Sequence, residues 1–99
     1  MEYRITNDNG DVTVSFSGDI TFSENVRFRE MLKELEGQSI KNGVFDISAV
    51  GMVDSAGLGM FLIAREQAVG AGWKLNVRGA QGHVASMLKL TKLSELLEG

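Results

Sequence analysis

The chain has 99 residues, of which 43% are hydrophobic and 23% are charged, and its formal net charge is −3. This balance is typical of one small globular domain with a single core, which we expect to span residues 1–99. The negative charge and the scattered basic residues argue against a nucleic-acid surface, because that function needs clustered Lys and Arg. Since the chain has no cysteine, disulfides and a thiolate zinc site are excluded.

No segment is expected to insert into a membrane. The first residues, Met-Glu-Tyr-Arg, lack the apolar stretch of a secretory signal peptide. No apolar run approaches the ~18 residues that a membrane-spanning helix requires. We therefore expect a cytoplasmic protein that has no direct membrane contact.

The first two elements are predicted to be the strands of a hairpin. Residues 3–6 begin the first strand, and residues 7–11 (Asn-Asp-Asn-Gly-Asp) have the composition of a turn, because Asn and Gly accept positive φ readily. In residues 12–17, Val and Phe alternate with Thr and Ser. This period of two is typical of a strand with one face on the core and one face in water.

A helix is predicted after a break at residues 18–20. Thr21 and Glu24 have the spacing of a capping box, and Gly37 is a natural stop. The apolar residues between them fall at helical spacing and form one buried stripe: Phe28, Met31, Leu32 and Leu35.

The central strand is predicted over residues 44–47, which lack clean alternation and therefore indicate a strand covered on more than one side. The next helix is predicted over residues 58–69 and ends at the glycines of residues 70–72. Its expected buried stripe consists of Leu58, Phe61, Leu62 and Val69.

The last strand is predicted over residues 73–78, followed by a third helix that carries Val84, Met87 and Leu88, and the apolar tail at residues 93–97 is expected to dock on the domain. The order β-β-α-β-α-β-α predicts an α/β fold whose mixed four- to five-stranded sheet has helices mainly on one face. The expected core includes Val14, Phe16, Val44, Phe45, Leu58 and Leu62.

The stretch 53–59, Val-Asp-Ser-Ala-Gly-Leu-Gly, lies between the central strand and the second helix. At such a junction the first N–H groups of the helix lack partners and the helix dipole is positive, so a phosphate on Ser55 would be held there. Asp54 or Ser55 can supply the N-cap, and Gly57 and Gly59 allow close approach of other backbone. Ser55 is either a modification switch on a protein-binding surface or only a capping serine.

No catalytic, cofactor or metal site is expected. His83 is the only histidine, and a base needs a nucleophile and an orienting partner within reach. Ser55 is not in a Gly-x-Ser-x-Gly elbow, which disfavours a small serine hydrolase. The chain also lacks a phosphate-binding Gly-x-x-x-x-Gly-Lys loop. Met52 and Met60 flank the switch, and each faces either a partner or the core.

The chain resembles a known family, the STAS domains of bacterial anti-sigma factor antagonists. The similarity covers nearly the whole length, from residue 12 to residue 97. It is most specific at residues 46–50 (Asp-Ile-Ser-Ala-Val) and 53–59, with residues 16–20 (Phe-Ser-Gly-Asp-Ile) upstream at the spacing of the family. The resemblance implies a non-catalytic regulator that binds a partner kinase of the anti-sigma type.

In that family the kinase uses ATP to phosphorylate the serine after the Asp of the motif, which corresponds here to Ser55. The unphosphorylated form binds the kinase, the phosphorylated form is released, and a PP2C-type phosphatase resets the switch. Ala56 replaces the Ser or Thr common at that position, so Ser55 is the only hydroxyl of the motif. The predicted partner-binding residues are Asp19, Met52, Asp54, Ser55, Ala56, Gly57, Leu58 and Gly59.

One alternative comes from the same resemblance. A stand-alone STAS domain can serve as a constitutive scaffold subunit of a membrane lipid-transporter complex. The presence of a phosphorylatable serine after the Asp favours the switch. Even within the antagonist group, the regulated target need not be a sigma factor.

Overall fold

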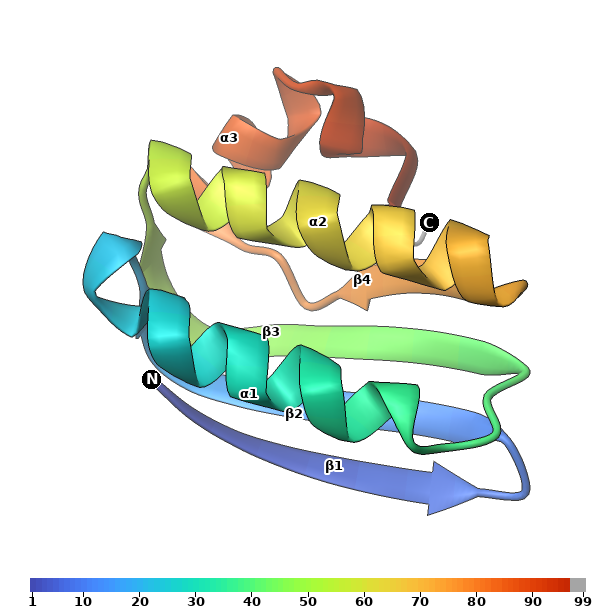
Figure 1. The fold of residues 1–99 in the computed structure, drawn as a ribbon. Helices are drawn as coiled ribbons and strands as arrows, with labels where there is room; N and C mark the ends of the chain where they lie inside the picture. Colours follow the sequence, from blue (N-terminus) through green and yellow to red (C-terminus); the bar gives the residue numbers. More distant parts are fainter. Residues whose placement is uncertain (97–99) are drawn as a thin grey trace.

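The computed structural model describes residues 1–96, and its elements follow the predicted order β-β-α-β-α-β-α with two added 3-10 turns (Figure 1). The elements are β1 (Glu2–Asp8), β2 (Asp11–Ile20), η1 (Phe22–Glu24), α1 (Asn25–Glu36), β3 (Asn42–Val53), α2 (Ser55–Ala71), β4 (Lys74–Arg78), α3 (Gly82–Lys89) and η2 (Lys92–Leu96). None of the helices within the described range is long and apolar enough to cross a membrane.

The four strands form one mixed sheet in the order β1-β2-β3-β4. β1 is antiparallel to β2, whereas β2, β3 and β4 run parallel. Buried and less buried residues alternate along β2 and β4, and α1 and α2 lie over one side of the sheet (Figure 1). The predicted α/β fold, with a mixed sheet and helices mainly on one face, is confirmed.

The core is built around four phenylalanines, one each from β2, α1, β3 and α2. The ring centroids of Phe16 and Phe45 are 5.1 Å apart, and those of Phe28 and Phe61 are 6.1 Å apart. These spacings are favourable for edge-to-face aromatic pairs, so the cluster joins both large helices to the two central strands. The predicted burial of Val14, Phe16 and Phe45 is confirmed, as is the whole apolar stripe of α1.

The predicted stripe of the second helix is wrong in part. Leu62 is 39% exposed and Val69 is 67% exposed, while Leu58 is only half-buried. The side of α2 that meets the core instead consists of Gly57, Met60, Phe61, Ala64 and Ala68. The helix is apolar on nearly every side, so periodicity alone did not identify its inner face.

β3 extends well beyond the predicted residues 44–47. Against β2 it carries one extra residue between Asp46 and Ala49, and another between Val50 and Val53. Such bulges interrupt the two-residue alternation of buried and exposed side chains, which explains why residues 48–53 lack the sequence pattern of a strand. The expected cover on more than one side is also wrong, since Val44 is only half-buried and lies on the open face of the sheet.

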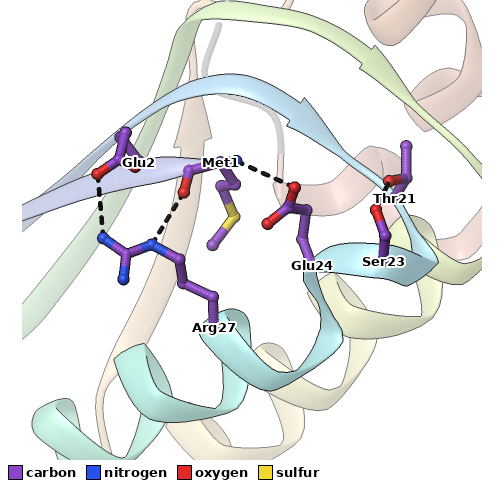
Figure 2. A network of polar contacts seen from close by, with 6 residues as sticks. All are labelled: Met1, Glu2, Thr21, Ser23, Glu24 and Arg27. Atoms are coloured by element: carbon purple, nitrogen blue, oxygen red, sulfur yellow. Dashed lines mark hydrogen bonds and ion pairs between the residues drawn. The ribbon is translucent and has the colours of Figure 1, made fainter.

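The expected capping box at the start of the first helix is not formed. Neither Thr21 nor Glu24 makes a side-chain cap bond; the carboxylate of Glu24 pairs instead with the amino group of Met1 at 3.2 Å (Figure 2). Arg27 donates from Nε to the Met1 carbonyl and also pairs with Glu2. These bonds hold the start of β1 against the start of α1.

The C-terminal tail docks as predicted over the part that the structure describes. Leu93 and Leu96 are 3% and 4% exposed, whereas Leu97 lies outside the described residues. In α3, Val84 and Leu88 are buried, but Met87 is only half-buried. The third helix therefore meets the core through a narrower stripe than expected.

Candidate functional site

Two segments far apart in sequence meet at one end of the molecule, where β2 leads into η1 and β3 leads into α2 (Figure 1). Because β2 and β3 are parallel, their carboxyl ends lie at the same edge of the sheet, and Ile20 is paired with Val53. The predicted motifs at residues 16–20 and 53–59 are therefore brought together by the sheet itself.

Asp54 connects these two segments. Its backbone is extended (φ −93°, ψ −178°), and it is the N-cap of α2. One carboxylate oxygen accepts a hydrogen bond from the Gly57 N–H at 2.7 Å, and the other accepts from the Phe22 N–H at 3.1 Å. Of the two cap candidates, the structure selects Asp54, and both of its oxygens are engaged within the fold.

Gly57 allows the two segments to approach closely. A Cβ at this position would overlap the carbonyl oxygen of Ile20 and would lie 2.7 Å from Cγ1 of Val53. Only glycine fits without displacement of the backbone. Gly59 is different, because a Cβ there would have no atom within 4 Å. The close approach predicted for both glycines is thus found at Gly57 alone.

Ser55 is exposed and is the first residue of α2. Leu58 donates its N–H to the Asp54 carbonyl, and Gly57 donates to the Asp54 side chain, so the first turn is fixed around the serine. Helix geometry leaves the first N–H groups free of intrahelical carbonyls and places the positive end of the dipole here. Ser55 is thus exposed at a hydrogen-bonded turn beside the positive end of the helix dipole.

The remaining predicted site residues differ in accessibility. Gly59 and Asp19 are exposed, and Met52 is 43% exposed, so each is available to a partner. Ala56 and Leu58 are half-buried, whereas Met60, which flanks the motif, is buried at 5% exposure and belongs to the core.

Phe22 also lies at this site, although no sequence motif indicated it. It is 71% exposed, and its N–H is bonded to Asp54, which places it beside the first turn of α2. The only available signal was a large aromatic residue directly after a predicted break. An exposed Phe on a fixed turn is the kind of side chain that protein interfaces favour.

The carboxylate of Asp46 makes its contacts within the fold. It accepts one hydrogen bond from the backbone N–H of Ser48 at 3.0 Å and another from the Ser48 hydroxyl at 2.8 Å. The guanidinium of Arg78 lies 3.3 Å from the same carboxylate. These contacts lower the pKa of Asp46.

His83 is exposed at the start of α3. Within residues 1–96, no group of three or more His, Asp or Glu side chains is placed to hold a metal ion.

Solved structures with the same fold include anti-sigma factor antagonists and a sulfate transporter family protein. An anti-sigma factor antagonist from Mycobacterium paratuberculosis is 22% identical, with a TM-score of 0.84 over 97% of this chain and 81% of that chain. The unphosphorylated anti-sigma factor antagonist SpoIIAA is 9% identical, with a TM-score of 0.82 over 98% and 86%. The phosphorylated Bacillus SpoIIAA is 10% identical, with a TM-score of 0.75 over 98% and 89%.

A sulfate transporter family protein from Wolinella succinogenes is 16% identical, with a TM-score of 0.77 over 93% of this chain and 79% of that chain. A comparison with curated protein sequences gave no significant match. The sequence itself matches the STAS domain over residues 2–98. This match covers nearly the whole chain, which therefore belongs to the STAS domain family.

Proposed function

We propose that this STAS domain is a cytoplasmic anti-sigma factor antagonist or a close relative, switched by phosphorylation of Ser55. It binds an ATP-using serine kinase of the anti-sigma type while Ser55 is free, and a PP2C-type phosphatase restores the binding form. The observation that carries this proposal is the exposed hydroxyl at the first position of α2, directly after a capping aspartate. The similarity to SpoIIAA, whose structure exists in unphosphorylated and phosphorylated forms, supports it.

The free domain should tolerate a phosphate on Ser55. The phosphate adds about −1.5 to −2 charges at neutral pH. The N-terminus of α2 offers N–H donors and a positive dipole end, which together stabilise an exposed anion by about 0.3–1 kcal/mol. Asp54 is the only carboxylate directly beside Ser55 in sequence, and its oxygens are already bonded to Gly57 and Phe22.

A docked complex should not tolerate the same phosphate. At the interface the phosphate would lose its water, and the Asp54 charge beside it would remain. A loss of about 2.7 kcal/mol in binding free energy corresponds to a hundredfold weaker complex. The modification would therefore preserve the fold and release the partner.

The alternative is a scaffold subunit of a membrane transporter complex, and the structural similarity to the Wolinella sulfate transporter family protein favours it. A scaffold of that kind would bind its partner constitutively. It would need no accessible hydroxyl at the start of α2, so the two functions differ in whether Ser55 is modified.

The direct test incubates the protein with ATP and the serine kinases of its own genome and locates phosphate by mass spectrometry. We expect a single phosphate on Ser55, and none on the Ser55→Ala variant. Ser23 and Ser48, which lie in or near the same end of the sheet and are also exposed, serve as internal controls. A protein that accepts no phosphate from any of these kinases, or accepts it only at the control serines, would contradict the switch.

A further inference from the structure

A row of residues leads from Ser55 along the outside of α2. Ser55, Gly59, Ile63 and Gln67 are spaced four apart, so each lies about 40° further around the helix than the one before, and the row winds from the start of α2 toward α1. Gly59 is exposed with no atom near a Cβ position, and Ile63 is 52% exposed. Ile63 is eight residues from Ser55, or about 12 Å along the axis. Nothing in the described chain covers this row between the serine and the isoleucine.

The row ends in an open groove between α1 and α2. The groove is lined by Arg29, Leu32, Lys33, Glu36, Ile63 and Gln67. Gln67 donates from Nε2 to the Leu32 carbonyl at 2.9 Å, which ties the two helices together beneath the groove. This bond joins the two walls of the groove in the free domain.

The groove combines apolar surface with positive charge. Ile63 exposes half of its side chain. Arg29 and Lys33 are exposed on the α1 side, one turn apart, and neither forms an ion pair with another residue in the range 1–96. Glu36 is the single acidic residue of the lining. A complementary ligand would present an apolar side chain to Ile63 and a carboxylate to the two cations.

We propose that this groove is the second half of the partner interface and receives a segment of the kinase that carries an apolar residue flanked by Asp or Glu. The inference rests on the proposed function, because the occupant is the kinase that acts on Ser55. A standard interface buries ~800 Å² on each partner, which is wide enough to cover both Ser55 and a groove about 12 Å away. The turn at Ser55 carries the switch, and the groove adds affinity and selectivity.

The test measures the affinity of the kinase that labels Ser55 for surface variants of the unphosphorylated protein, by isothermal titration calorimetry. Ile63→Gln should raise Kd at least tenfold, which corresponds to 1.4 kcal/mol. The matched control is Val69→Gln, on the same helix, at a residue that is 67% exposed and lines a different hollow. It should leave Kd within twofold of the parent value.

The charge requirement has its own pair of variants. Lys33→Glu should raise Kd at least tenfold at low salt and less at high salt, because the lost attraction is electrostatic. Lys89→Glu changes the net charge equally at the exposed end of α3 and should leave Kd within twofold. Melting curves for all four variants verify that the fold is intact.

The outcomes separate the groove from the switch. If the kinase binds the parent, and both Ile63→Gln and Lys33→Glu bind equally well, the groove proposal is overturned while the proposed function stands. If the parent neither binds a kinase nor accepts phosphate, the proposed function fails, and the inference fails with it. If sedimentation shows a dimer that only Ile63→Gln and Lys33→Glu dissociate, the occupant is a second copy and the proposal is again overturned.

Discussion

The two long helices, α1 and α2, each bury a phenylalanine in the core, but the surfaces that they expose to solvent differ in polarity. Phe28 of α1 and Phe61 of α2 are 1% and 0% exposed, and their rings are in contact across the helix pair. On the outside, α1 is largely charged, and its one large exposed apolar residue is Val26. α2 exposes Leu62, Ile63 and Val69. The core accounts for the apolar stripe of α1, whereas it leaves three large apolar side chains of α2 exposed.

Under the proposed function, this contrast favours α2 as the source of the apolar surface in the interface, beside the cations that α1 supplies. An amphipathic helix such as α1 has one apolar stripe, and the core uses it. In α2 the core is satisfied partly by small residues, Gly57, Ala64 and Ala68, so the larger aliphatic side chains are free to point outward. Because the same helix begins with Ser55, the exposed Ile63 side chain and the proposed switch belong to one element.

The largest expected effect tests the similarity of the inner faces. Phe28→Ala and Phe61→Ala should each reduce the free energy of unfolding by about 3–5 kcal/mol, since both remove a buried ring from the same cluster. Chemical denaturation measures both values. A loss below 1 kcal/mol for Phe61→Ala, with a full loss for Phe28→Ala, would show that α2 is not seated on the core as described.

A second comparison uses two glycines two residues apart in α2. Gly57→Ala should cost about 1–3 kcal/mol, because the added methyl meets the Ile20 carbonyl and the Val53 side chain. Gly59→Ala should raise the free energy of unfolding by about 0.5–1 kcal/mol, because the added methyl group would lie in open space and alanine is favoured over glycine within a helix. Thermal melts would test the order of the two variants, and equal stabilities would contradict the close contact at Gly57.

The third comparison concerns the two helix starts. Asp54→Ala removes the cap of α2 and frees the Phe22 N–H as well, so it should cost about 0.5–2 kcal/mol. Glu24→Ala removes only a partly exposed ion pair with the amino group of Met1, and α1 has no side-chain cap, so the loss should stay below about 1 kcal/mol. The urea midpoints of the two variants measure this difference. A larger loss of stability for Glu24→Ala than for Asp54→Ala would contradict the assignment of Asp54 as the stronger cap.

The smallest expected effect tests the outer face of α2. Leu62→Ala should change the free energy of unfolding by no more than about 1 kcal/mol, and Val69→Ala by no more than about 0.5 kcal/mol, as at other surface positions. A buried leucine would cost 2–5 kcal/mol. A measured loss in that range for Leu62→Ala would mean that this side of the helix is packed, and the contrast with α1 would be lost.

The sequence correctly predicted those parts of the fold where the spacing of apolar residues allows a single interpretation. The alternation around Val14 and Phe16 and the stripe containing Phe28 and Met31 were both confirmed. The wrong predictions have physical causes. α2 is apolar on nearly every side, so the burial of Leu62 could not be decided from spacing, and the bulges of β3 concealed its last residues.

The candidate site was predictable only in outline. The position of Ser55 at a helix start followed from the motif, and the structure bears out that position. The bond from Phe22 to Asp54 joins residues 32 apart in sequence, so no local pattern could indicate it. The same holds for the groove, because its walls come from two helices that meet only in the folded domain.

The measurement that tests the central claim most directly is a titration of the kinase with three forms of the protein: the parent, Ser55→Ala and Ser55→Asp. Melting curves serve as the control for folding. We expect the parent and Ser55→Ala to bind with similar Kd. Ser55→Asp should fold normally yet bind about a hundredfold more weakly, a difference of about 2.7 kcal/mol. If Ser55→Asp binds as tightly as the parent, and the parent accepts no phosphate, the domain is a constitutive scaffold and not a switch.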